Sequence, residues 1–358
     1  MTRPYAARRG RLRTELAGRW MLVTTPANVR YLSGFTGSNG QILIGPDPDH
    51  AYLLTDHRYR HRAGTQAPEL DLVLTRAPFE AAFERVDQQL RVEADHLSWR
   101  QGRALEGAGK VGGTEVVATS GVVESLRSLK DDTEIATLAD ACRITTDAIN
   151  ELIHTVVSVG RTELELARWL ERRFVELGAD GVAFAPIIAA GPNGAAAHHE
   201  PTDRPIKAGE LLTIDAGAKV DGYHADCTRT VALGHIDDER AQLYSVVAQA
   251  QAAGCTAVAA GRKAQDVDAA ARQVIDTAGF NDWFVHGTGH GVGLQIHESP
   301  AISATSDEIL RASMVCTIEP GIYIPGLGGV RIEDTVLVRD DRPPRVLTDL
   351  PKALEIIA

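Results

Sequence analysis

Two aspartates near the middle of the chain are spaced so that a hairpin would bring their carboxylates together. Residues 211–217 form a strand-like apolar run that contains Asp215, and Asp221-Gly222 is a strong signal for a two-residue hairpin turn. Folding the chain about that turn places Asp215 opposite Thr228, and Asp226 two residues from Thr228. Because side chains alternate along a strand, both carboxylates point to the same face, with Cα atoms about 7–8 Å apart. Two bare carboxylates would repel there, and a bound cation would remove the repulsion.

A second pair of acids has the same arrangement around a glycine-rich turn. Glu319 precedes Pro320-Gly321 at the end of one strand-like run, and Glu333 lies at the end of the returning run. A turn centred on Gly326 places Glu319 opposite Glu333. The plain alternative is a pair of acids on a solvated face, but both lie among apolar strand residues and near Gly and Pro residues that constrain the backbone. The second hairpin therefore adds two carboxylates to the candidate cation site.

The segment between the hairpins is rich in glycine and histidine. Residues 286–294 contain His286 and His290, and His297 follows shortly after. No Lys-Ser/Thr pair follows the glycines, and there is no clean strand–GxGxxG–helix unit, so the segment does not match a phosphate-binding or dinucleotide-binding loop. Four carboxylates and one imidazole carry about four negative charges, which matches two divalent cations such as Mn²⁺, Co²⁺, Fe²⁺ or Zn²⁺. Two such ions can share a bridging hydroxide and polarise a carbonyl, so the pattern favours metal-assisted hydrolysis.

Helix pairs are predicted before each group of candidate residues, and the first pair has clear start signals. Asp131 with Glu134, and Thr162 with Glu165, form capping boxes, and apolar residues follow each at helical spacing. A comparable helix pair is predicted at about 239–260 and 266–278. Each pair is followed by strands and glycine-rich turns, which indicates a duplicated helix–helix–sheet unit. A domain boundary is expected near residue 130.

The first third of the chain alternates strand-like and helical runs. Residues 20–24, 41–44 and 51–54 are typical of strands, and Gly and Pro residues separate them. This pattern predicts a mixed α/β domain. Six arginines are spaced among the apolar residues Leu12, Leu16 and Trp20, and we expect these arginines on the solvated face of a first helix: Arg3, Arg8, Arg9, Arg11, Arg13 and Arg19.

Length and composition exclude several classes of protein. A chain of 358 residues has the length of two ordinary domains. Its net charge of −11 argues against a general nucleic-acid binder, and no apolar run approaches the ~20 residues that cross a bilayer. The four cysteines are scattered and form no CxxC pair, so we expect buried, reduced thiols in a cytoplasmic protein.

At the acidic and histidine motifs the chain resembles the "pita-bread" metallopeptidase superfamily of methionine aminopeptidase, aminopeptidase P and prolidase. The similarity covers about residues 131–358 and rests on residues 215–217, 221–230, 286–300, 319–323 and 329–334. The resemblance implies that Asp215, Asp226 and Glu333 bind one ion. It implies that Asp226, His290, Glu319 and Glu333 bind the other.

The resemblance also implies roles for residues around the ions. His198 corresponds to a catalytic histidine, although the family more often has Pro where this chain has Ala197. His198 and His297 would hydrogen-bond the scissile amide and the developing charge, and Glu319 would shuttle a proton. The remaining residues resemble those around a prolyl pocket, with support of the metal ligands as the alternative role: His286, Tyr323 and Arg331.

Residues 28–40 and 55–59 resemble the creatinase-type N-terminal domain of aminopeptidase P and prolidase, with His57 in place of the usual Gly. We therefore expect an α/β (α+β) protein with a creatinase-like domain at 1–130 and a pita-bread catalytic domain at 131–358. Methionine aminopeptidases lack the first domain, and creatinase lacks the metal ligands.

The leading expectation is an Xaa-Pro aminopeptidase that removes the first residue from peptides with proline in second position. It would be a homodimer with two divalent ions per chain, Mn²⁺ being favoured by the hard ligands and Zn²⁺ or Co²⁺ being compatible. The alternatives are an Xaa-Pro dipeptidase (prolidase), a non-catalytic binding protein on the same fold, and a metal-free amidinohydrolase.

Overall fold

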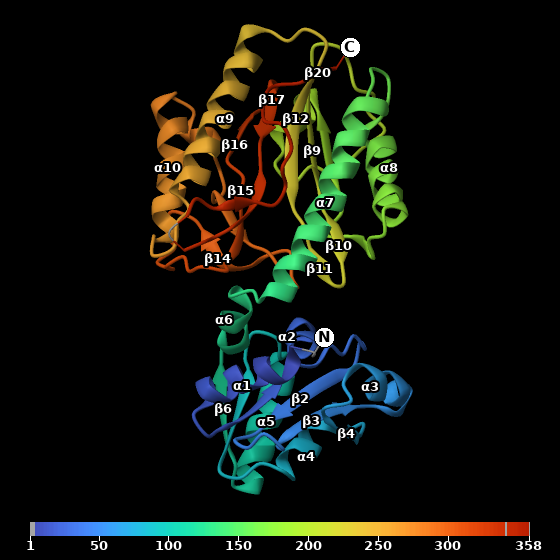
Figure 1. Cartoon of the computed structure of the whole chain (residues 1–358), viewed down its shortest axis with the longest axis vertical. Helices are drawn as coiled ribbons and strands as arrows, with labels where there is room; N and C mark the ends of the chain where they lie inside the picture. Colours follow the sequence, from blue (N-terminus) through green and yellow to red (C-terminus); the bar gives the residue numbers. More distant parts are fainter. Residues whose placement is uncertain (1–3, 341, 358) are drawn as a thin grey trace. The chain divides into compact units, whose positions relative to one another are not determined.

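The computed structural model describes residues 4–340 and 342–357 of the chain and divides into two compact units, Met1–Arg127 and Ser128–Ala358 (Figure 1). No helix in these described ranges is long and apolar enough to span a membrane.

The N-terminal unit is built on a six-stranded sheet with the strand order β4-β3-β2-β1-β5-β6. The central strand β1 is buried along its whole length, because helices cover the sheet on both faces. The elements, in chain order, are α1 (Tyr5–Leu16), β1 (Trp20–Val23), α2 (Pro26–Ser33), β2 (Gly40–Ile44), β3 (Ala51–Thr55), η1 (His57–Tyr59), α3 (Arg60–Gln66), β4 (Asp71–Leu74), α4 (Pro78–Phe83), β5 (Gln89–Glu93), α5 (Trp99–Gly112), β6 (Glu115–Thr119) and α6 (Val122–Ser128).

The expectation that the arginines of α1 lie on a solvated face is wrong for Arg8 and Arg9. Both are buried, with 3% and 6% of their surface exposed. Arg8 donates a hydrogen bond to the carbonyl of Tyr31, and Arg9 donates to the carbonyl of Leu32 and to Glu69. The two guanidinium groups satisfy carbonyls at the end of α2, a tertiary role that helical spacing does not reveal. Arg3 lies outside the described residues.

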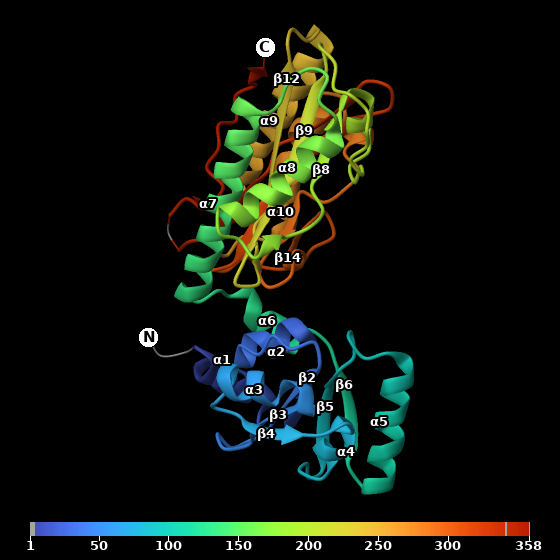
Figure 2. The ribbon, with the colours of Figure 1, turned by 90° about the vertical axis from the view of Figure 1, so that its right-hand side faces the viewer.

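The C-terminal unit contains two helix pairs on opposite sides of a set of mainly antiparallel sheets (Figures 1 and 2). The first pair is α7 and α8, and their N-terminal capping boxes are those predicted at Asp131 and Thr162. It packs on β8, β9 and β12, whereas the second pair, α9 and α10, packs on β16 and β17. Strands follow each pair, as expected for a duplicated unit.

The elements of the C-terminal unit run from α7 to β20. In chain order they are α7 (Asp132–Thr155), α8 (Glu163–Glu176), β7 (Gly181–Val182), β8 (Ile187–Ala190), η2 (Gly191–Ala195), β9 (Leu211–Ala216), β10 (Ala218–Val220), β11 (Tyr223–His224), β12 (Cys227–Leu233), α9 (Asp238–Ala257), α10 (Ala264–Thr277), η3 (Asn281–Trp283), β13 (Gly289–Gly291), β14 (Glu298–Ile302), β15 (Val315–Ile318), β16 (Gly321–Ile324), β17 (Gly328–Arg331), β18 (Asp334–Leu337), β19 (Arg345–Val346) and β20 (Ile356–Ile357).

Candidate metal centre

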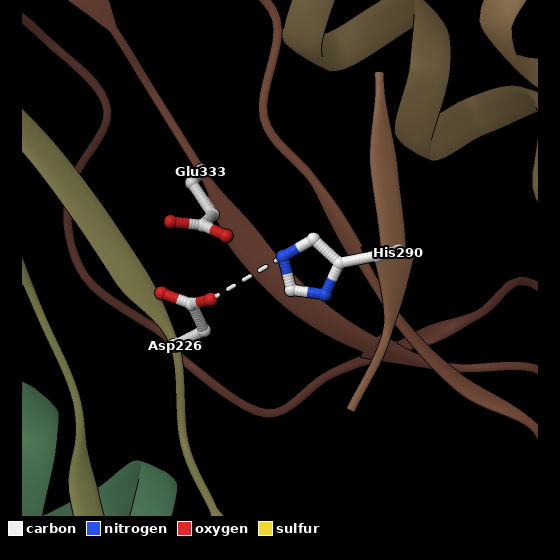
Figure 3. A group of neighbouring side chains, drawn as sticks. All are labelled: Asp226, His290 and Glu333. Atoms are coloured by element: carbon white, nitrogen blue, oxygen red, sulfur yellow. Dashed lines mark ion pairs between the residues drawn. The ribbon is translucent and has the colours of Figure 1, made fainter. Parts of the chain in front are cut away.

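Asp226, His290 and Glu333 form the centre of the candidate site (Figure 3). One ligand atom from each lies within 4.8 Å of the others, and His290 Nε2 is 3.5 Å from Asp226 Oδ2. The imidazole comes from β13, and its Nδ1 lies 3.1 Å from the carbonyl oxygen of Gly291. A hydrogen bond from Nδ1–H to that carbonyl would orient Nε2 toward the carboxylates, as is typical of a histidine that binds a metal.

The first hairpin has the register predicted from its turn. Asp221 and Gly222 both have positive φ, 42° and 73°, as a two-residue primed turn requires. Val220 pairs with Tyr223 and Asp215 pairs with Thr228 across the ladder. Asp226 therefore comes immediately before β12, beside the strand that carries Asp215.

The second hairpin also has the predicted register, but its ladder is interrupted at the two acids. Ile318 pairs with Asp334 on one side, and Gly321 pairs with Arg331 on the other, so Glu319 and Glu333 lie in the gap. Their backbone amides bond elsewhere in the site. Glu319 donates to the carbonyl of Thr288 (2.7 Å), and Glu333 donates to the carbonyl of Thr228 (3.1 Å). These bonds attach the second hairpin to the first and to the histidine segment.

Burial leaves negative charge in this site uncompensated. Loss of solvation and repulsion by neighbouring carboxylates raise the pKa of Asp226 and of Glu333 well above their ordinary values. Burial also raises the pKa of Asp215, although Arg331 acts against the shift. Asp215 Oδ1 and Glu333 Oε1 are buried, and neither has a hydrogen-bond partner among the described residues. Buried oxygens without donors are costly, so the donor set fits divalent cations, which would satisfy these oxygens and remove the repulsion.

Glu319 and His290 form a closer pair at the edge of the centre. His290 Nε2 is 3.3 Å from Glu319 Oε1, which also accepts a hydrogen bond from Thr317 Oγ1 (3.2 Å). Burial acts in the opposite direction, but the bond to His290 lowers the pKa of Glu319, and the bond to Glu319 raises the pKa of His290. Glu319 therefore remains ionised at neutral pH.

Arg331 links the acids to a buried polar chain. Its Nη2 donates to Asp215 Oδ2 (2.6 Å), its Nε donates to Thr228 Oγ1 (3.2 Å), and its Nη1 donates to Tyr323 OH (2.8 Å). Tyr323 OH also lies 2.8 Å from His286 Nε2. Burial raises the pKa of Tyr323 to about 12, so this hydroxyl is neutral. Arg331 and Tyr323 thus orient a candidate ligand.

The acids open into a cavity of about 490 Å³. His198 and His297 line it, and the ring of His297 lies edge-on to His290 with 4.3 Å between centroids. Burial and the neighbouring His290 lower the pKa of His297, so its imidazole is neutral at pH 7. The predicted residues that line the cavity are Asp215, Asp226, Glu319, Glu333, His290, His198, His297, His286 and Arg331. Tyr323 is not among the lining residues and lies behind them.

Thr228 is a functional candidate that the motif analysis did not single out. Its hydroxyl donates to Glu333 Oε2 at 2.7 Å and accepts from Arg331 Nε, so it connects the two hairpins. The turn at Asp221-Gly222 already places Thr228 opposite Asp215, which was a sufficient signal that its side chain faces the acids. Glu163 was not named as a candidate either, yet its carboxylate forms hydrogen bonds with His199 and Thr202 in the loop that carries His198.

The raised pKa values predict an unusual pH dependence for the metal-free protein. Asp226 and Glu333 bind protons more tightly in the folded than in the unfolded state, where their pKa values are about 4. Stability is therefore lost as pH rises above about 4, each group contributing a slope of at most about 1.4 kcal/mol per pH unit. Metal-loaded protein should show the opposite slope, because protons compete with the ions.

Thermal denaturation between pH 5 and pH 8, with chelator and with added metal, checks this prediction. The variant Asp226→Asn in chelator serves as the control, because it should have a shallower slope than the unmodified chain. Equal slopes for these two metal-free proteins would contradict the assignment of the pH dependence to this cluster.

Replacing Thr228 with Val should weaken metal binding by about 10–100-fold, because Glu333 and Arg331 lose the hydroxyl between them. Thr213→Val is a matched control. Thr213 is also buried on this strand pair, but its hydroxyl contacts Thr230 and no acid of the site. Calorimetric titration of metal-free protein with Mn²⁺ measures both variants. Equal affinities in the two would show that Thr228 does not support the ligands.

Residues 136–340 match the model of Metallopeptidase family M24, and residues 8–129 match the Creatinase/Prolidase N-terminal domain. The chain is 34% identical to the Xaa-Pro dipeptidase of Pyrococcus furiosus over 91% of this chain and 92% of that protein.

Two solved structures resemble the whole chain. An Xaa-Pro dipeptidase from Bacillus anthracis has a TM-score of 0.92 and 35% identity, covering 99% of each chain. An X-Pro aminopeptidase from Thermotoga maritima has a TM-score of 0.87 and 31% identity, covering 97% of this chain and 100% of that one.

These matches confirm the expected fold, an α/β (α+β) chain with a creatinase-like N-terminal domain followed by a pita-bread domain. Members of the matched family use divalent metals, and the carboxylate and histidine cluster described above is a possible site for them. The chain therefore belongs to metallopeptidase family M24 and is a hydrolase of peptide bonds.

Proposed function

We propose that this protein is an Xaa-Pro aminopeptidase that hydrolyses the bond before proline at the second position of a peptide. The main support for the proposal is that the guanidinium of Arg331 is already hydrogen-bonded to groups of the protein. Among the described residues that line the cavity, Arg331 is the only arginine or lysine. Its nitrogens donate to Asp215, Thr228, Tyr323 and the carbonyl of Ala197. A dipeptide presents a free carboxylate next to the scissile bond, and this guanidinium is already occupied by partners in the protein.

An Xaa-Pro dipeptidase is the second candidate, and the names of relatives from Pyrococcus furiosus and Bacillus anthracis favour it. That activity would require a cation from outside the cavity described here to bind the substrate carboxylate. The two candidates share the metal centre. They differ in whether the protein must provide a cation for the carboxylate at the C-terminal end of the substrate.

The five predicted ligands would hold two divalent ions: Asp215, Asp226, His290, Glu319 and Glu333. Such ions lower the pKa of a water molecule and polarise the carbonyl of the scissile bond. Asp226 and Glu333 are the carboxylates whose repulsion the ions would relieve, and Thr228 and Arg331 fix the orientation of Glu333 and Asp215. The ligand set is a proposal whose support is the buried, unpartnered oxygens of Asp215 and Glu333.

Glu319 is the proposed proton-transfer residue. Its carboxylate is ionised and lies at the edge of the cavity, so it can accept a proton from the attacking water and deliver it to the proline nitrogen. His198 and His297 donate N–H groups from the cavity wall to the scissile amide and to the negative charge that develops on its oxygen. His286 lines the same cavity and is proposed to contact the prolyl side of the substrate; apolar residues such as Phe184 and Ile296 also line this cavity.

The proposal predicts a preference for peptides longer than two residues. We expect kcat/KM for Xaa-Pro-Xaa tripeptides to exceed that for matched Xaa-Pro dipeptides by about tenfold or more, because only the dipeptide brings an unpaired carboxylate to the prolyl subsite. Xaa-Ala-Xaa peptides are the control for proline, and chelator-treated protein is the control for metal. Hydrolysis restricted to dipeptides would replace this proposal with the dipeptidase.

We propose Mn²⁺ as the metal, because four carboxylates and one imidazole form a hard, oxygen-rich ligand set. Reconstitution of metal-free protein with Mn²⁺, Zn²⁺ or Co²⁺, with turnover expressed per bound ion, should give the highest value for Mn²⁺. A higher turnover per bound ion with Zn²⁺ or Co²⁺ would contradict the choice. We also predict, from composition and family resemblance, that the protein is cytoplasmic and forms a homodimer. Sedimentation analysis tests the homodimer.

A further inference from the structure

Glu163 is a buried carboxylate outside the metal centre. It is the first residue of α8, follows the capping residue Thr162, and has no exposed surface. Although burial raises its pKa, the hydrogen bonds that it accepts, led by the amide of Ala190, lower the pKa overall. An ionised group without solvent contact needs donors on both oxygens, and the structure shows what supplies them.

The donors to Glu163 all come from one segment, residues 190–202. Oε1 accepts from the amide of Ala190 (2.8 Å) and from Asn193 Nδ2 (2.9 Å). Oε2 lies 2.9 Å from His199 Nε2 and accepts from the amide and the hydroxyl of Thr202 (3.1 and 2.8 Å). One carboxylate thus ties both ends and the middle of this segment to the start of α8.

The same segment is fixed on its other side by the metal-site hairpin. Arg331 Nη1 donates to the carbonyl of Ala197 at 3.3 Å. Gly194 packs so closely on β17 that a Cβ atom there would lie 2.9 Å from the backbone nitrogen of Gly329. His198 therefore stands between a residue held by Arg331 and a residue held by Glu163. Its own ring lines the cavity and has no hydrogen bond within the part of the chain that the structure describes.

We infer that Glu163 is a positioning residue that sets the place of His198 for catalysis, acting through His199, Asn193 and Thr202. This inference rests on the proposed role of His198 as a donor to the scissile amide. A donor on a loop is effective only when the loop backbone is held within a fraction of an ångström, and displacement by about 1 Å can cost 100-fold in rate. Because His198 has no partner of its own, its position depends on the bonds made by its neighbours.

The test is a double-mutant cycle between Glu163 and His198, read by steady-state kinetics on an Xaa-Pro-Xaa peptide. Glu163→Gln keeps the size of the side chain but replaces one acceptor oxygen with an NH₂ group. This group faces the donors of residues 190–202 and cannot accept hydrogen bonds from them. We expect its kcat to fall by about tenfold or more, with KM and metal content close to those of the unmodified protein. In the His198→Ala background the same change should alter kcat by less than about twofold, because the residue that Glu163 positions is gone.

Glu93→Gln is the matched control for loss of a buried carboxylate. Glu93 is buried in the N-terminal unit and accepts from the amides of Thr24 and Thr25, the hydroxyl of Thr24 and the side chain of Asn28. We expect a comparable loss of thermal stability with little change in kcat. If Glu163→Gln does not fold, Thr202→Val removes one bond to Glu163, and Thr202→Ser restores it. Thr202→Val should then lower kcat in the unmodified protein but change it little in the His198→Ala background, and Thr202→Ser should retain activity.

The possible outcomes separate this inference from the proposed function. If His198→Ala leaves kcat unchanged, the proposed role of His198 fails and the inference fails with it. If His198→Ala lowers kcat but Glu163→Gln lowers it by the same factor in both backgrounds, Glu163 acts independently of His198, and only the inference is overturned. A loss of bound metal in Glu163→Gln would also overturn it.

Discussion

Four carboxylates share one buried site in this protein, and their mutual repulsion is the constraint on which the site depends. Arg331 compensates Asp215, and His290 lies 3.3 Å from Glu319 and 3.5 Å from Asp226, but the pKa of Asp226 and of Glu333 is still raised well above its ordinary value. Protonation or bound cations are the two ways to remove the remaining charge. Bound cations would keep the acids ionised as ligands, and they could activate a water molecule for hydrolysis, which protonated acids alone could not do.

The backbone holds these acids close despite the repulsion. Two hairpins supply one acid pair each, and hydrogen bonds from Glu319 to Thr288 and from Glu333 to Thr228 join the hairpins and the histidine segment. Arg331 extends this framework outward, because it contacts Asp215 on one side and Ala197, next to His198, on the other. The residues proposed for metal binding and for substrate binding therefore share one rigid support.

Local sequence signals predicted the elements that short-range geometry determines. The Asp221-Gly222 turn fixes the partner of each residue in its hairpin, so the pairing of Asp215 with Thr228 followed from the turn alone. The capping boxes at Asp131 and Thr162 identified helix starts for the same reason. The burial of Arg8 and Arg9 did not follow, because it depends on carbonyls 23 residues away in the chain. The bonds of Glu163 to residues 27–39 positions later were hidden for the same reason. Chain-length preference also lies beyond local patterns, since it depends on what meets the far end of the substrate.

We propose that the clustered carboxylates bind two divalent ions. Anomalous diffraction from crystals of Mn²⁺-loaded protein tests it most directly. We expect two manganese peaks in each chain, both coordinated within the set Asp215, Asp226, His290, Glu319 and Glu333. A fully loaded crystal with no ion among these side chains, or with ions only elsewhere in the chain, would contradict it.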